Sequence, residues 1–150
     1  MVDDDDYEGL LKYKWYASQG RNHQPYAIRW IWVPEKRNNR FVKMHRQLTG
    51  ATLGEKVDHI NHDTLDNRKE NLRICTDQQN QGNEVISVNN TSGFKGVSWR
   101  KDRQKWRAYI AIDQKQISLG HFKNKKSAAL AYNDAANKFF KEFALLNYIK

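Results

Sequence analysis

The sequence contains a single cysteine, Cys75, among its 150 residues. One thiol cannot form an internal disulfide or supply a four-cysteine zinc site, so both are excluded. No stretch of about 18 consecutive apolar residues occurs, which excludes a transmembrane helix. Residues 3–6 are all acidic, where a secretory leader would be basic and then apolar. Together these features predict a protein of the reducing cytoplasm with no membrane partner.

Charge is unevenly distributed along the chain, which carries a formal net charge of +9. Residues 1–92 hold 13 Lys/Arg and 13 Asp/Glu, whereas residues 93–150 hold 13 Lys/Arg and 4 Asp/Glu. The whole positive excess therefore lies in the C-terminal part. This pattern makes a polyanion the first hypothesis for a partner, with a solvated basic surface as the alternative.

The length allows one ordinary domain or two very small ones. Extended aromatic stretches predict a β-rich segment at residues 7–50, with strands at 26–33 and 41–45. Residues 51–83 are polar and rich in loops, and residues 84–92 lack a clear period, which is typical of a linker. The acidic run near the start is expected to be disordered.

From Gly93 onward the pattern predicts three strands, at residues 95–100, 106–112 and 116–122. In the second of these, apolar and polar residues alternate with the period of a half-buried strand. A helix is predicted to follow, with Asn124 as its N-cap. One apolar stripe is expected on that helix, formed by Ala128, Tyr132, Ala135 and Phe139.

Three residues in the middle of the chain can meet the chemical requirements of phosphodiester hydrolysis. A neutral imidazole with an ordinary pKa near ~6.5 can take a proton from water, and His59 supplies one. A hard divalent cation can stabilise the developing negative charge when oxygen ligands such as Asp58 and Asn80 hold it. Because Asp58 and His59 are adjacent, both can serve one site only where a strand ends or bends.

A set of motifs surrounds these residues in a fixed order. Its members are His45-Arg46, Asp58-His59-Ile60-Asn61, Asp66-Asn67-Arg68, Glu70-Asn71-Leu72-Arg73 and Asn80-x-x-Asn83. The segment from Met44 to Asn83 therefore resembles the HNH nucleases of phage and intron-encoded homing endonucleases, in the HNN subtype. The resemblance implies a ββα-metal fold, built from a β-hairpin and a helix.

The same resemblance assigns roles to individual residues. It implies that His59 is the general base and that Asn71 holds the hairpin loop, and with it His59, in position. It also implies that Asp58 and Asn80 bind the catalytic cation, Mg²⁺ or Mn²⁺. His62 stands where relatives often have Gly, which leaves two possibilities, a different turn or a histidine that reaches the phosphate.

A second set of motifs covers residues 92–148. Its members are Ser92-Gly93-Phe94-Lys95-Gly96-Val97, Lys105-Trp106-Arg107-Ala108, Leu119-Gly120-His121-Phe122, Ala128-Ala129, Ala131-Tyr132 and Ala144-Leu145-Leu146-Asn147-Tyr148. This segment resembles an AP2 domain, in which a three-stranded sheet enters the DNA major groove while a helix braces its back. The resemblance and the charge give these candidate DNA contacts: Lys95, Ser98, Arg100, Lys101, Arg103, Arg107, Tyr109, Gln116 and Ser118. Several of them depart from the arginine-rich face of the plant transcription factors, so the target sequence does not transfer.

Combined, these features predict an α+β protein. A β-rich segment leads into a ββα-metal nuclease fold, followed by an AP2-like three-stranded antiparallel sheet packed on one helix. The predicted domains are residues 1–83 and 93–150, joined by the linker at 84–92.

The predicted function is that of a metal-dependent endonuclease that nicks or cuts double-stranded DNA at sites selected by its AP2-like domain. It would act as a monomer or a dimer in the cytoplasm of a bacterium or a phage-infected host cell. Two alternatives stay open. One is a DNA-binding regulator with a vestigial HNH fold, and the other is an RNA-binding or RNA-cutting protein.

Overall fold

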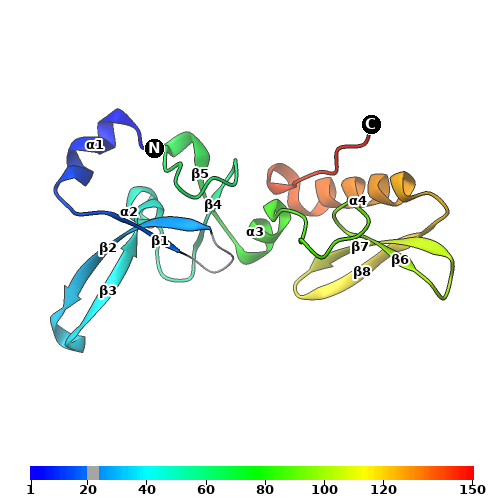
Figure 1. The fold of residues 1–150 in the computed structure, drawn as a ribbon, viewed down its shortest axis with the longest axis horizontal. Helices are drawn as coiled ribbons and strands as arrows, with labels where there is room; N and C mark the ends of the chain where they lie inside the picture. Colours follow the sequence, from blue (N-terminus) through cyan, green and yellow to red (C-terminus); the bar gives the residue numbers. More distant parts are fainter. Residues whose placement is uncertain (20–23) are drawn as a thin grey trace. The chain divides into compact units, whose positions relative to one another are not determined.

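A computed structural model describes residues 1–19 and 24–150. The chain divides into two compact units, Met1–Thr76 and Asp77–Lys150, each with its own antiparallel strands and helices (Figure 1). The fold is thus of the mixed α and β type, with antiparallel sheets, as the sequence predicts. Within the described ranges, no helix combines the length and the apolar character that crossing a bilayer requires.

The described residues of the first unit form two antiparallel sheets. Strands β1, β2 and β3 form one sheet in that order, and β4 pairs with β5 in the other. Its elements are α1 (Asp4–Leu11), β1 (Tyr16–Gln19), β2 (Pro25–Val33), the 3-10 turn η2 (Pro34–Lys36), β3 (Asn38–Lys43), α2 (Met44–Thr49), β4 (Lys56–His59), the 3-10 turn η3 (Lys69–Asn71) and β5 (Leu72–Cys75).

The β2–β3 hairpin is reversed by residues that suit their backbone conformations. Pro34 begins η2, where its fixed φ favours a helical turn, and Arg37 ends it in the left-handed region at φ 46°. Pairing is antiparallel, with Trp30 opposite Phe41. The predicted strand at residues 26–33 is confirmed as β2.

The acidic run at residues 3–6 is ordered, so the prediction of disorder is wrong. Three of its carboxylates lie in the first turn of α1, where they meet the partial positive charge of the helix N-terminus. Asp3 accepts a hydrogen bond from the Lys69 backbone N–H at 2.7 Å, and Asp6 pairs with the Lys69 ammonium at 3.0 Å. These contacts join segments far apart in the sequence, which composition alone does not reveal.

The predicted strand at residues 41–45 ends two residues early. β3 stops at Lys43, and Met44 and His45 begin α2, where both side chains are buried. The helix ends before Gly50, which takes the left-handed conformation at φ 65° that commonly closes helices. This short helix therefore lies within residues 7–50, the segment that the sequence predicts to be β-rich.

The second unit contains a three-stranded antiparallel sheet in the order β6-β7-β8, with α4 packed on it. Its elements are α3 (Asp77–Asn83), β6 (Val97–Arg100), β7 (Lys105–Ile112), β8 (Lys115–Phe122), α4 (Lys125–Phe140) and the 3-10 turn η4 (Lys141–Phe143). Small residues allow α4 a close approach, and at Gly96 even one added Cβ would collide with the Tyr132 ring. The core between helix and sheet is built on Val97, Ala108, Ala128 and Ala129.

The three predicted strands and the helix of this unit are confirmed, with their ends shifted by one or two residues. Lys95 and Gly96, expected to begin the first strand, precede β6. Asn124 caps α4 as predicted, because its side-chain oxygen accepts from the Lys126 backbone N–H at 2.7 Å.

The predicted apolar stripe of α4 is wrong in its second half. Ala136 and Phe140 are buried, whereas Phe139 is 40% exposed and Ala135 is half-buried. The buried row follows the i, i+4 ridge from Tyr132, and this ridge is inclined to the helix axis. A stripe drawn at the average period of about 3.6 residues drifts away from that ridge.

The two compact units divide before α3, whereas the sequence predicts a domain boundary after residue 83. Gly82 of α3 packs against Phe140, and an added Cβ there would lie 2.7 Å from the ring. The Leu145 backbone N–H also donates to the Gly82 carbonyl at 3.0 Å. Residues 84–92, all of them described, form neither helix nor strand and lie within the second unit, so their role as a linker stays a prediction.

Candidate functional site

The β4–β5 hairpin carries the predicted hydrolytic residues of the first unit. Asp58 and His59 are the last two residues of β4, opposite Arg73 and Leu72 of β5. Both side chains are buried, with exposures of 7% and 5%. The strand ends at His59, which is the condition under which two adjacent residues can serve one site.

Asn71 closes the loop between β4 and β5 through three hydrogen bonds. Its Oδ1 accepts from the Asn61 backbone N–H at 2.9 Å, and its Nδ2 donates to the Asp66 carbonyl at 2.8 Å. Its own carbonyl accepts from the Ile60 N–H at 3.0 Å, directly after His59. Asn71 is 5% exposed, so water competes little for these bonds. Its contacts therefore fix the chain that leaves His59.

A buried carboxylate stiffens the same loop. Asp66 accepts hydrogen bonds from Arg68 Nε at 2.9 Å and Nη2 at 2.7 Å. Asn61 Nδ2 donates to the same carboxylate at 2.9 Å. The hydrogen bonds from Arg68 hold the pKa of Asp66 well below its usual range, so the carboxylate is charged at neutral pH. The ion pair between Asp66 and Arg68 thus holds the same loop as the hydrogen bonds of Asn71.

The His59 imidazole lies in a cluster of three rings. The His45 ring meets it edge-on with centroids 5.1 Å apart, and the Tyr26 ring lies 6.2 Å from it. The Lys43 ammonium lies 4.3 Å from the centroid of the Tyr26 ring. Burial lowers the pKa of His59, so its ring is neutral at physiological pH. Burial and the neighbouring His59 lower the pKa of His45 to about 3.

Asp58 forms an ion pair across the hairpin. Arg73 Nε and Nη2 lie 2.9 Å and 2.7 Å from the Asp58 Oδ2 atom. The two residues face each other in the strand register, so the pairing of β4 with β5 itself brings them together. The guanidinium therefore orients this carboxylate.

Asn80 lies in α3, the first helix of the second unit, and is half-buried there. The first unit thus brings together Asp58, His59 and Asn71, while the convergence of Asn80 with them stays a prediction. Within residues 1–19 and 24–150, no three or more His, Cys, Asp or Glu side chains gather as a metal cage.

The backbone conformation of His62 rules out a different turn at the position where relatives often have Gly. Its φ is 66°, the left-handed conformation that Gly adopts freely, and its N–H donates to the His59 carbonyl at 3.0 Å. The backbone of the turn is therefore kept, and His62 tolerates the strain of roughly 1 kcal/mol that this conformation costs.

The open face of the sheet in the second unit carries most of the predicted DNA contacts. Ala108 points to α4 and is fully buried, so the neighbouring Arg107 lies on the opposite face. Strand pairing places Ser98 and His121 on either side of Arg107. These residues form the centre of the open face.

Further contacts on this face join β7 to β8. Arg107 Nη2 donates to Gln116 Oε1 at 3.4 Å, and its guanidinium lies 5.1 Å from the Tyr109 ring centroid. Tyr109 in turn pairs with Ser118. Together with Ser98, the structure therefore brings five of the predicted contacts together on one face.

The turn between β6 and β7 supplies three more cations. Lys101 and Arg103 are exposed there, and Arg100 Nε and Nη2 bind Asp102 at 2.9 Å and 3.1 Å. Arg103 lies 3.8 Å from the same carboxylate. Arg100 and Arg103 thus share the Asp102 carboxylate, and together with Lys101 they leave a positive excess at this edge of the sheet.

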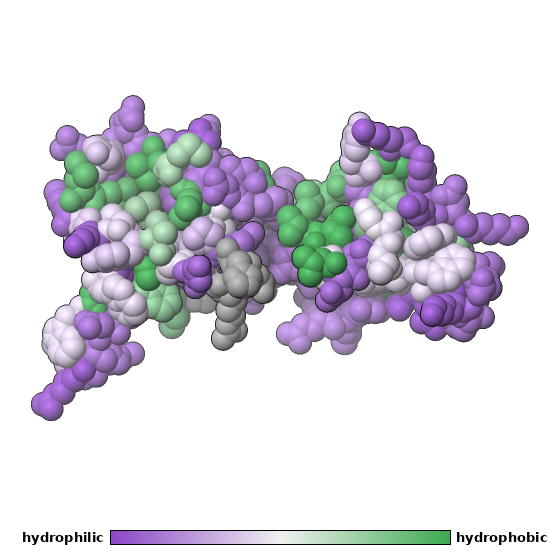
Figure 2. Space-filling view, viewed as in Figure 1, coloured by the Kyte–Doolittle hydropathy of each residue, from purple (hydrophilic) through white to green (hydrophobic). Residues whose placement is uncertain are grey.

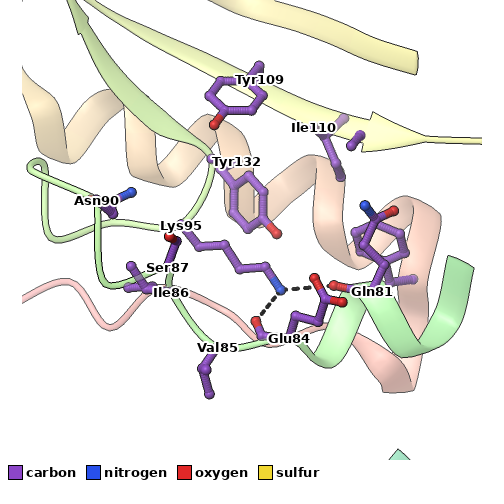
Figure 3. Close-up of a pocket in the computed structure, with 13 residues that line it drawn as sticks. Gln81, Glu84, Val85, Ile86, Ser87, Asn90, Lys95, Tyr109, Ile110 and Tyr132 are labelled. Carbon is purple, nitrogen blue, oxygen red and sulfur yellow. Dashed lines mark hydrogen bonds between the residues drawn. The ribbon is translucent and has the colours of Figure 1, made fainter. Parts of the chain in front are cut away.

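Lys95 is turned toward α3 rather than toward the open face. Its Nζ donates at 3.2, 2.7 and 2.6 Å to the carbonyls of Gln81, Gly82 and Glu84, and Figure 3 draws the bonds to Gln81 and Glu84. These bonds use all three of its N–H donors. The side chain borders a pocket of ≈ 220 Å³, and burial lowers the pKa of Lys95 to about 8. Lys95 therefore caps the end of α3, and we do not retain it as a DNA contact.

Two neighbours of the candidate sites are absent from the predicted set. Tyr26 reaches His59 across a long sequence separation, for which no local signal exists. His121 could have been found, since strand alternation places it beside Arg107. Burial and the nearby Arg103 lower the pKa of His121, so it is neutral at physiological pH.

Comparison with known proteins is informative for the nuclease segment. Residues 52–81 match the family model described as HNH endonuclease, and the match spans Asp58, His59, Asn71 and Asn80. The motifs from Asp58 to Asn80 therefore fall inside the matched segment, whereas His45-Arg46 and Asn83 lie outside it.

Two viral proteins are similar to this chain. "Protein 3.8" of Escherichia phage T7 is 38% identical over 63 residues, which are 42% of this chain and 52% of the phage protein. The chain thus spans about half the length of that relative. The "Uncharacterized HNH endonuclease L560" of Acanthamoeba polyphaga mimivirus is 27% identical over 146 residues, covering 93% of this chain and 70% of that protein. Residues 52–81 are thus similar to HNH endonucleases, and the two similar proteins named here are viral.

Proposed function

We propose that this chain is a metal-dependent DNA endonuclease whose cutting site is selected by its C-terminal, AP2-like unit. The observation that carries the proposal is the buried His59 at the end of β4, which is neutral and held by a braced loop. The HNH endonuclease match over residues 52–81 supports the same chemistry. The substrate is double-stranded DNA, and the products are a nick or a double-strand break.

His59 acts as the general base. Its lowered pKa keeps the imidazole neutral at pH 7, so it accepts a proton from the water that attacks phosphorus. The bond from phosphorus to the 3′ oxygen breaks, and that oxygen leaves with a proton from solvent. This gives the 5′-phosphate and 3′-hydroxyl ends that the family resemblance implies. Asn71 serves as the positioning residue, because a misplacement of about 1 Å can cost ~10²-fold in rate.

The proposed ligands of the cation are Asp58 and Asn80. A carboxylate and an amide oxygen are hard donors, the kind that suits Mg²⁺ or Mn²⁺. When bound, the cation supplies electrostatic stabilisation of the charge that develops on the phosphate and the leaving oxygen. Arg73 holds the Asp58 carboxylate in one orientation, which prepares one of the two ligands.

The open face of the second unit binds the DNA duplex. Arg107 and the three cations of the β6–β7 turn meet phosphates, and the polar side chains between them face the bases. Four phosphate contacts give a slope of about −3.6 in a plot of log affinity against log salt. The proposed contacts are Ser98, Arg100, Lys101, Arg103, Arg107, Tyr109, Gln116 and Ser118.

A second candidate is a DNA-binding regulator that keeps the HNH fold as a scaffold. The ion pair between Asp58 and Arg73 favours it, because a guanidinium can take the place of a metal cation beside a buried carboxylate. The two candidates differ in whether the chain breaks a phosphodiester bond.

Supercoiled plasmid incubated with the full chain and Mg²⁺ separates the two candidates. The endonuclease converts the plasmid to nicked or linear forms, and His59→Ala loses this activity. His62→Gly removes an imidazole from the same loop, and a wild-type nicking rate in this variant shows that His62 has no contact with the phosphate and that the loss is specific to His59. Absence of nicking by the wild-type chain, or equal nicking by His59→Ala, refutes the endonuclease and favours the regulator.

A further inference from the structure

The β2–β3 hairpin presents three large aromatic side chains to solvent. Trp30, Trp32 and Phe41 are 55%, 58% and 48% exposed, although such residues usually supply a core. Trp30 and Trp32 share one face of β2 by strand alternation, and Phe41 stands opposite Trp30 with ring centroids 5.9 Å apart. We call these three residues the aromatic surface. It lies on a hairpin that extends beyond α1 and α2 of the same unit (Figure 1).

The aromatic surface continues the sheet face that leads to His59. Tyr26 lies on the same face of β2 as Trp30 and Trp32, and its ring is 6.2 Å from the His59 ring. With a rise of about 3.4 Å per strand residue, the two tryptophans lie roughly 14 and 20 Å from Tyr26. A stacked DNA strand advances about 3.4 Å per nucleotide. The aromatic surface therefore lies roughly four to six nucleotides from the Tyr26 ring, which neighbours the His59 ring.

Charge on the hairpin favours a polyanion over a second copy of the chain. Between residues 25 and 43 there is one acidic residue, Glu35, and Figure 2 shows hydrophilic atoms beside paler and apolar ones at this end of the unit. A second copy would bring like charges together on both hairpins, whereas nucleic-acid phosphates would be attracted. The basic residues of the hairpin are Arg29, Lys36, Arg37, Arg40 and Lys43.

We propose that the aromatic surface stacks on unpaired nucleotides, so that the preferred substrate is DNA with a single-stranded segment beside a duplex. This inference rests on the proposed nuclease function and extends its site. Bases inside a duplex cover one another's faces, whereas an unpaired base offers a free face to an indole ring. Exposed aromatic rings flanked by cations are the combination that binds single strands without sequence readout.

Binding measured in EDTA tests this inference without any cleavage. Fluorescence anisotropy compares a labelled duplex with the same duplex bearing a ten-nucleotide single-stranded arm, using the full chain. The wild type should bind the armed duplex about tenfold more tightly or better. Trp30→Ala and Trp32→Ala should each lose most of this preference while affinity for the plain duplex stays within about twofold.

Two control variants sharpen the result. Trp30→Phe should keep most of the preference, because a phenyl ring also stacks on bases. Tyr7→Ala removes an aromatic residue of α1 that is 54% exposed and lies outside the aromatic surface, so it should bind both probes like the wild type. Circular dichroism melting curves establish that each variant is folded, and Trp30→Leu, which keeps an apolar side chain without a ring that can stack, carries the test where an alanine variant unfolds.

Either of two results overturns the stacking inference. One is equal affinity of the wild type for the two probes, and the other is an equal loss on both probes in the alanine variants. Failure of the nuclease proposal is seen separately, in the plasmid assay, because the binding test requires no catalysis. A chain that prefers the armed duplex but never nicks a plasmid supports stacking and refutes the nuclease.

Discussion

Replacement of Asn71 by alanine should loosen the loop that holds His59. The change removes the acceptor for the Asn61 N–H at 2.9 Å and the donor to the Asp66 carbonyl at 2.8 Å. A buried polar group left without its partner costs about 1–3 kcal/mol. Two such groups, partly compensated by water, give an expected loss of about 2–4 kcal/mol in the free energy of unfolding. A domain of ordinary stability survives such a loss in the folded state.

The rate of DNA nicking by Asn71→Ala should fall by about 10²-fold at a temperature where the variant is folded. The reason is positional, since the brace fixes the chain directly after His59 and a small displacement of the base is costly. Affinity for duplex DNA should change little, because the proposed duplex contacts lie in the second unit.

Urea denaturation followed by circular dichroism gives the free energy of unfolding, and plasmid time courses give the rate. Asn137→Ala on the exposed side of α4 is the matched control and should match the wild type in both. The positioning role is refuted if Asn71→Ala is destabilised but nicks at the wild-type rate. It is equally refuted by a variant with wild-type stability and full activity.

Three further predictions concern stability and binding. The pKa of His45 is lowered to about 3, so the unfolded chain binds a proton first as the pH falls below 6.5. The free energy of unfolding of the wild type should therefore fall by roughly 2 kcal/mol between pH 7 and pH 5, whereas that of His45→Phe should lack this fall. Urea denaturation at both pH values measures the two changes, and an equal change in both proteins would contradict the prediction. Lys95→Met should lower the free energy of unfolding by about 1–3 kcal/mol and leave the salt dependence of DNA binding unchanged. A smaller salt slope in a filter-binding titration would return Lys95 to the DNA-contacting set. His62→Gly should raise the free energy of unfolding by about 0.5–1 kcal/mol because it relieves a φ of 66°, and a lower melting temperature would argue against that strain.

Elements specified by local patterns were predictable from the sequence. The alternation of polar and apolar residues gives β7 its two faces, and Asn124 marks the start of α4 by hydrogen bonding two residues ahead. The end of β4 at His59 follows from the polar turn residues that begin at Asn61. In each of these places, neighbours within a few residues decide the structure.

Features that depend on distant partners were not predictable in the same way. The acidic run looks disordered by composition, but Asp3 binds the Lys69 backbone and α1 forms. Lys95 looks like a phosphate ligand by alignment, but the carbonyls at the end of α3 capture its ammonium. The ring cluster around His59 joins Tyr26 to residues far along the chain. Tertiary contacts determine these three features, and the local periodicity of the sequence carries no information about such contacts.

The role of His59 as general base is tested most directly by the pH dependence of DNA cleavage. Initial rates on a labelled duplex at saturating Mg²⁺ are measured from about pH 5 to 9, over the range where circular dichroism shows a folded chain. A buried His59 with a lowered pKa predicts a rate that rises with pH through a midpoint below 6.5, and a slow His59→Ala variant at every pH. A midpoint above 6.5, or a His59→Ala variant with the wild-type profile, would contradict a general base at this position.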